Sequence, residues 1–158
     1  MSAMRSRLVG MAVVGFMLVC CHKVPYEDLM NAPEQVEIES KTITAEGPVW
    51  RSYMPVEYEV TGSDLCAALS LVSSDTIHPF PSDVWADRLW VIKSPCEIWG
   101  AILRHSEKWW PKYVLFYRVT GGPRWPVGTH VSVAARIRNA DGSTWLIRAP
   151  ETEVGRVE

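Results

Sequence analysis

The chain has 158 residues, of which 47% are hydrophobic and 22% charged, and its net charge at pH 7 is −2. This composition is typical of a globular protein and excludes a largely disordered chain. The slight acidic excess also argues against a nucleic-acid-binding protein, because such proteins usually carry a strongly basic surface.

The chain begins with a segment that has the features of a signal peptide. Arg5 and Arg7 are positively charged, and residues 8–19 are uncharged and mostly apolar. Twelve such residues suit the central region of a signal peptide and are too few for a membrane-spanning helix, which needs about 20. We therefore predict that residues 1–20 are removed on export. The remaining 138 residues carry 14 basic and 18 acidic side chains, a charge near −4, and are enough for one domain.

The end of this segment, Leu18-Val19-Cys20-Cys21, resembles the lipobox of bacterial lipoproteins. In that family a cysteine thiol receives diacylglycerol, signal peptidase cuts before it, and the new amino group is acylated, for example with palmitate. The resemblance implies lipidation at Cys21. The alternative is Cys20, which would place the larger Val19 directly before the cleavage site. His22, which is not Asp, implies transport to the outer membrane, with the periplasmic face expected, rather than retention in the inner membrane.

Residues 21–35 are predicted to be a lipidated tether, because they contain two prolines and no clear hydrophobic period. The sequence also allows a short turn of helix around Tyr26–Met30. The single β-rich domain is expected over residues 36–158.

From residue 36 the apolar residues recur with the period of a strand. Val36 and Ile38 alternate with glutamates, and the segment 56–60 repeats the pattern. Three further segments are apolar runs: 66–72, 96–103 and 113–119. The first suits a covered strand, although its two alanines leave a helix open, and the other two suit central strands packed on both faces.

Residues 82–89 allow two interpretations. Ser82 and Asp83 are typical of a helix start, so a short helix through Leu89 is one prediction. A loop leading into a strand at 89–93 is the other.

The C-terminal part predicts a β-hairpin over residues 129–149. Val131, Val133, Ala135 and Ile137 alternate with more polar neighbours, and the turn residues of 139–142 follow. Residues 143–148 form the expected return strand.

About seven short strands separated by turns indicate an antiparallel β-sandwich. An immunoglobulin-like sandwich is the first expectation and a partly open barrel of the OB type the second, because no sequence fingerprint separates the two.

After export, Cys66 and Cys96 are the cysteines that remain in the domain. In an oxidising compartment two such cysteines most simply form a disulfide. Two free thiols are the alternative.

No residue pattern in the chain indicates catalysis, a cofactor or a metal. The four histidines lack metal-ligand spacing with another His or Cys, and the motifs of proteases, hydrolases and nucleotide-binding proteins are missing. The acidic and histidine clusters at 57–59, 83–87 and 105–107 are explained by exposed surface. We therefore expect a protein that is not an enzyme.

Tryptophan is unusually frequent, with eight residues, and most of them should fill the core. Trp99, inside an apolar run, is the best core candidate. Two loops combine tryptophan with cations, which are typical anchors of binding surfaces. Their predicted binding residues are Arg104, Lys108, Trp109, Trp110, Lys112 and Trp125.

These observations predict a lipid-anchored binding or assembly module that contacts cell-envelope proteins. A glycan- or lipid-binding module that uses the loop tryptophans, on peptidoglycan or a bilayer, is the first alternative. An envelope hydrolase is the second.

Overall fold

The computed structural model describes residues 23–54, 62–104, 106 and 111–158. The predicted signal peptide, the lipidation site and the strand at 56–60 lie outside these residues. The described chain contains the helix α1 (Tyr26–Met30) and the strands β1 (Gln35–Ile38), β2 (Lys41–Glu46), β3 (Val49–Ser52), β4 (Leu65–Ser73), β5 (Val84–Ser94), β6 (Glu97–Ile102), β7 (Val114–Gly122), β8 (His130–Asn139), β9 (Thr144–Arg148) and β10 (Thr152–Val157).

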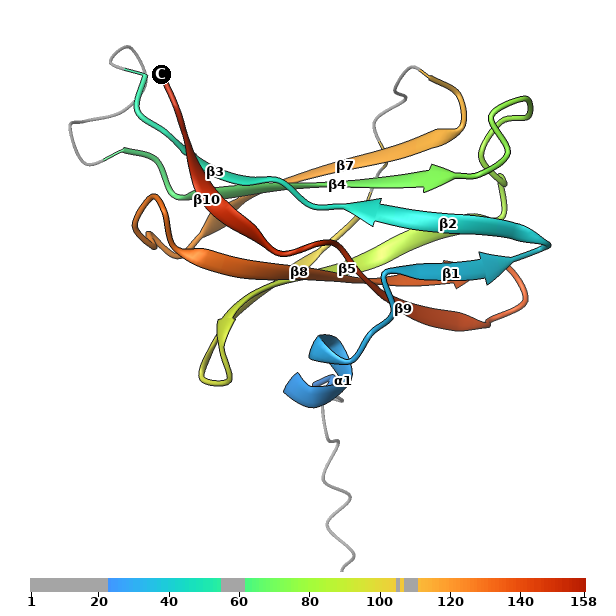
Figure 1. Ribbon diagram of the computed structural model, residues 1–158, viewed down its shortest axis with the longest axis horizontal. Coiled ribbons are helices and arrows are strands. Elements are labelled where there is room, and N and C mark those ends of the chain that lie inside the picture. The colour runs from blue at the N-terminus through green and yellow to red at the C-terminus, as the bar shows by residue number, and fades with distance from the viewer. Residues whose placement is uncertain (1–22, 55–61, 105, 107–110) are drawn as a thin grey trace, which may run out of the picture.

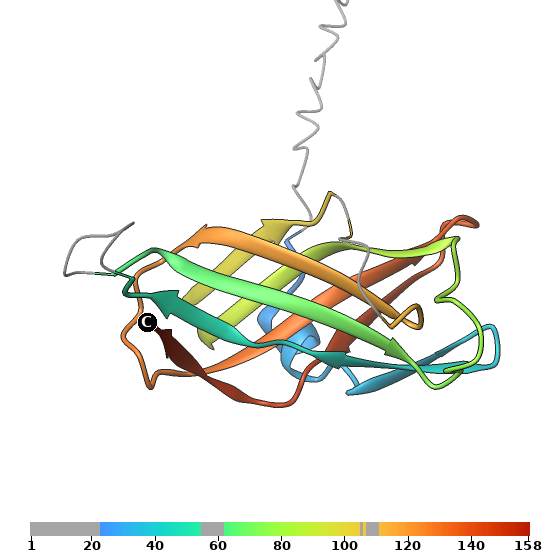
Figure 2. The ribbon, with the colours of Figure 1, turned by 90° about the horizontal axis from the view of Figure 1, so that it is seen from above.

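The strands join in one hydrogen-bonded path that folds into two layers. The order is β1-β2-β4-β3-β10-β8-β5-β6, with β7 also paired to β4 and β9 to β8. Figure 1 shows β2, β3, β4 and β7 in one layer and β5, β8 and β9 in the other. Figure 2 shows that the strands of the two layers run in different directions. β10 connects the layers, since it pairs parallel with β3 and antiparallel with β8.

The layers meet over a core built from the alternate residues of each strand. On β4 and β8 these include Leu69, Leu71, Val133 and Ile137, each at most 1% exposed. The Tyr117 hydroxyl on β7 accepts a hydrogen bond of 2.9 Å from the backbone N–H of Ala86 on β5, which ties the two layers inside the core. This burial raises the pKa of Tyr117. The predicted mainly-β fold of the sandwich type is thus confirmed, while the immunoglobulin-like order stays a prediction.

The predicted hairpin at 129–149 is confirmed. β8 and β9 pair in register from Ala134–Arg148 to Arg138–Thr144. In the turn between them Gly142 has a φ of 91°, which a residue without Cβ adopts at no steric cost. The Ser143 N–H donates to the side-chain oxygens of Asn139 and Asp141.

Two predictions of secondary structure need correction. The helix over 82–89 is wrong, because β5 begins at Val84 and pairs with β8 from its first residue. The runs 96–103 and 113–119 form β6 and β7 as predicted, but not as central strands: among the described residues, β6 pairs with β5 and β7 with β4 only. Trp99 of β6 and Leu115 and Val119 of β7 pack against the core, whereas Ile102 of β6 is 55% exposed.

The predicted Cys66–Cys96 disulfide is also wrong, since both cysteines are free thiols in the structure. Cys66 lies on β4, opposite Trp50 of β3, whereas Cys96 is exposed in the turn between β5 and β6. The two cysteines therefore belong to different layers. Burial raises the pKa of the Cys66 thiol.

Residues 23–34, expected as part of a tether, pack on the domain. The helix α1 matches the turn left open at Tyr26–Met30 and lies outside the sandwich, beneath the layer of β8 and β9 (Figure 1). Its Leu29 is 1% exposed. After α1, Pro33 accepts a hydrogen bond of 2.8 Å from the N–H of Arg148 on β9. Within the described segments, no helix has the length and apolar character needed to cross a membrane.

Candidate functional site

The loop surface predicted from the sequence is only partly described. Arg104 and Lys112 are exposed, while Lys108, Trp109 and Trp110 lie outside the described residues. Trp125 is 8% exposed and belongs to the main core, so little of its side chain is accessible to a partner. The backbone N–H of Trp125 donates a hydrogen bond to the carbonyl of Pro123, which forms a tight turn. The sequence GGPRWP did not indicate that this turn places the tryptophan in the core. The predicted core residue Trp99 does pack against the main core.

A better-described candidate for a binding surface is the outer face of the layer formed by β6, β5, β8 and β9. The register places the side chains of this face in rows across the strands. Its members are Ile98, Gly100 and Ile102 on β6, Trp85, Arg88, Trp90 and Ile92 on β5, Ser132, Ala134, Arg136 and Arg138 on β8, and Thr144, Leu146 and Arg148 on β9.

One half of this outer face is covered by α1. Leu29 packs with Ile92 and Ala134 in a small buried cluster. The partly buried residues around this cluster are Val24, Tyr26, Met30, Trp90, Ile98 and Leu146. The uncovered half exposes large apolar side chains, with Trp85 at 40% and Ile102 at 55% exposure.

An arginine network lies between the covered and the open half. The pairing of β5 with β8 shifts register between Ala86 and Arg88, so Asp87 has no partner residue on β8. Its carboxylate accepts two hydrogen bonds of 2.8 Å from Arg136 and lies 2.6 Å from Nε of Arg138. These hydrogen bonds raise the pKa of Arg136. The carboxylate thus holds two guanidinium groups on the outer face.

Two hollows flank the first described residues of the chain. The larger has a volume of about 680 Å³ and lies between α1 and the β5–β6 hairpin; we call it the hairpin groove. The smaller, of about 330 Å³, lies toward β9 on the other side of residues 23–25. Lys23, Val24 and Arg136 line both hollows.

The hairpin groove combines an apolar floor with a cationic rim. Val24, Trp90 and Ile98, which are partly buried, supply apolar surface, and Leu29 lies buried beneath them. The floor is flat at Gly100, where a Cβ atom would come within 3.3 Å of Trp90. Lys23, Arg88 and Arg136 supply positive charge around it. Only Arg136 has a carboxylate partner: within the described part of the chain, no ion pair engages Lys23 or Arg88.

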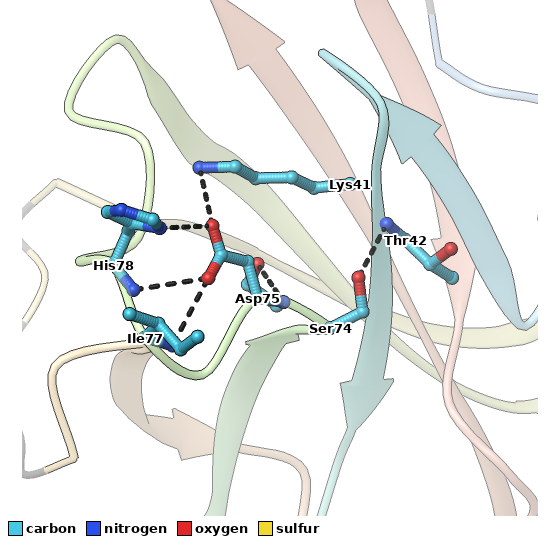
Figure 3. Close-up of polar contacts among 7 residues, drawn as sticks. Lys41, Thr42, Ser74, Asp75, Ile77 and His78 are labelled. Carbon is cyan, nitrogen blue, oxygen red and sulfur yellow. Dashed lines mark hydrogen bonds and ion pairs between the residues drawn. The ribbon is translucent and has the colours of Figure 1, made fainter.

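A second polar cluster, around Asp75 in the loop between β4 and β5, has a structural role. Its Oδ1 accepts hydrogen bonds of 3.1 Å from the N–H groups of Ile77 and His78. Its Oδ2 lies 2.9 Å from Nδ1 of His78 and 3.4 Å from Nζ of Lys41 (Figure 3). Both carboxylate oxygens are therefore engaged within the loop and its neighbour.

The other titratable clusters considered from the sequence are only partly described by the structure. Residues 57, 59, 105 and 107 lie outside the described residues, and Asp87 faces the arginines rather than Asp83. In the described portion, no group of three or more His, Cys, Asp or Glu side chains is arranged to hold a metal ion.

Sequence reasoning missed the hairpin groove. The alternation of β8 did place Arg136 and Arg138 on the polar face of the hairpin, which was the available signal. The bulge at Asp87 and the docking of α1, which create the groove, depend on contacts between distant segments.

Comparison with protein-family models, with curated proteins and with solved structures finds no match to this chain.

Proposed function

We propose that the chain is an exported, lipid-anchored binding module of the bacterial cell envelope, acylated at Cys21 and carried to the outer membrane. The observation that carries the binding role is the open half of the outer face, where Ile102 is exposed and the exposed Trp85 pairs with Arg138 across β5 and β8. Tryptophan and arginine are the residues that most often contribute large binding energies. We call these three residues the Trp85 patch.

The position of the N-terminal segment supports the same proposal. Lys23 follows the proposed acylation site by two residues and lines hollows on this outer face. The anchor would therefore leave the domain near the Trp85 patch, within reach of a protein embedded in the same membrane. Three acyl chains bury enough CH₂ groups for a stable anchor without a spanning helix.

The strand pairing supports an immunoglobulin-like order within this module. β4 lies between β2–β3 and β7 in one layer, and β8 lies between β5 and β9–β10 in the other. β10 then crosses to pair in parallel with β3. Such sandwiches commonly act as recognition modules, although that likeness is an analogy of fold alone.

One experiment in the native cell tests the anchor and the contact surface together. A photoreactive residue replaces Trp85, or as a control replaces Thr44, which is exposed on the opposite layer. We expect a discrete cross-linked partner in the membrane fraction from position 85 and none from position 44. Cys21→Ser should abolish acylation, as measured by intact mass, and release the protein from the membrane, whereas Cys20→Ser should not. Equal cross-linking from both positions, or an unacylated wild-type chain, would overturn the proposal.

A further inference from the structure

From the hairpin groove we infer that the protein binds the headgroup of an anionic phospholipid of the membrane in which it is anchored. This inference rests on the proposed lipid anchor for the nearness of the bilayer, but not for the chemistry of the groove. It is independent of the Trp85 patch, which does not line the groove.

The charge of the groove selects an anionic ligand. The chain beyond the signal peptide has a net charge near −4, yet three cations, Lys23, Arg88 and Arg136, line this one hollow. Asp87 neutralises Arg136, and no carboxylate in the described chain does the same for the other two cations. Because guanidinium and ammonium groups form strong charge-assisted hydrogen bonds with phosphate oxygens, an anionic headgroup complements this rim.

The floor of the groove requires that the ligand also have an apolar part. Val24, Trp90 and Ile98 are partly buried residues whose apolar surface cannot hydrogen-bond a free phosphate ion, whereas the glycerol and first methylenes of a lipid would cover it. The volume of about 680 Å³ lies within the usual range of ligand sites.

The place of the groove favours a bilayer lipid over a free amphiphile. An anchor two residues before Lys23 keeps the groove at the membrane surface, where headgroups are present at high effective concentration. A negatively charged leaflet also attracts clustered cations. Binding of one headgroup would fix the orientation of the domain on the membrane.

The native thiol Cys96, which is exposed and lines the groove, provides the measurement. The purified mature chain is titrated with dihexanoyl phosphatidylglycerol below its micelle concentration, and the rate of maleimide alkylation at Cys96 is followed by peptide mass analysis. We expect saturable slowing at Cys96, with no change at Cys66, which lies in the other layer and serves as an internal reference. Dihexanoyl phosphatidylcholine and inorganic phosphate should not protect Cys96.

Charge-matched variants complete the test. Arg88→Gln should weaken the apparent affinity for dihexanoyl phosphatidylglycerol about tenfold, because one charge-assisted contact is lost. Arg118→Gln removes the same charge from an exposed position on β7 and should leave the affinity unchanged.

Several results would overturn the inference. Equal protection by the zwitterionic lipid would show that charge does not select the ligand, and protection by phosphate alone would show a simple anion site. Protection that depends on protein concentration would show a second copy of the chain in the groove. Failure of the anchor is detected separately by intact mass, since the short-chain lipids reach the groove without any membrane.

Discussion

Asp75 is the residue whose ionisation is most clearly coupled to the fold. Hydrogen bonds to its carboxylate, first from the backbone N–H of His78, lower its pKa from 3.8 to about 2. The charged form also faces Lys41 at the start of β2. One carboxylate thus closes the loop after β4 and joins it to the β1–β2 hairpin (Figure 3).

This pKa predicts how stability depends on pH. Because the folded-state pKa is below the unfolded value, the contribution of Asp75 is fully present above about pH 4 and is lost as the pH falls through about 2. Asp75→Asn should therefore unfold at lower urea than the native protein at pH 6. The difference in urea midpoint between the two proteins should become smaller as the pH falls from 4 to 2.

Urea unfolding of both proteins from pH 2 to pH 6 measures this effect. Asp83→Asn controls for the loss of one negative charge near the same loop. A difference between Asp75→Asn and native protein that stays constant down to pH 2 would contradict the assigned role.

At the scale of elements, α1 is too short to be stable alone and depends on its contact with the sheet. It has five residues and no side-chain cap at its N-terminus. Its buried residue, Leu29, packs on Ile92 of β5 and Ala134 of β8. Leu29 is thus the buried centre of the contact that covers half of the outer face, with Val24, Tyr26 and Met30 packed around it.

Leu29→Ala should loosen this segment without unfolding the sandwich. Truncation of a buried leucine costs about 2–5 kcal/mol, with the lower end expected here because the cluster is small and near the surface. The amide of Asn31, which bonds to Glu27, should exchange hydrogen faster, while amides of β8 keep their protection. Hydrogen-exchange mass spectrometry measures both in one experiment.

Asp28→Ala, at an exposed position of the same helix, is the matched control and should leave the exchange unchanged. Equal loss of protection in α1 and β8 would show instead that the segment is an integral part of one cooperative core.

Local patterns predicted the elements well where the sequence itself sets their geometry. The alternation along β8 and the turn residues Asn139, Asp141 and Gly142 act between neighbours, so the hairpin was predictable. At 82–89 a helix start and a strand were both compatible with the sequence. Pairing with β8 determines that this segment is a strand, and this pairing joins residues about fifty positions apart.

At the scale of the whole molecule, the sequence predicted the class of fold but not the distribution of its tryptophans and cysteines. Trp125 in a proline-rich loop and Trp85 on an amphipathic strand look similar in sequence, yet the first is 8% exposed and the second 40%. Which of them reaches the surface depends on how the two layers close. The hairpin groove arises in the same way, from an N-terminal segment placed on strands about sixty residues later.

The two layers are held together by packing and by β10 rather than by a covalent bond. Cys66 and Cys96 lie in different layers as free thiols. A disulfide closing their loop of about thirty residues would contribute about 3–4 kcal/mol by constraining the unfolded chain. The structure predicts that this contribution is missing.

Reductant should therefore leave the urea midpoint of the purified protein unchanged. Alkylation without prior reduction should label both cysteines, Cys96 faster than Cys66, because Cys66 is half-buried and burial raises its thiol pKa. Peptide mapping distinguishes the two sites. A peptide containing both cysteines linked together, with a lower urea midpoint in reductant, would show that export oxidises the pair and draws the two layers into a different packing.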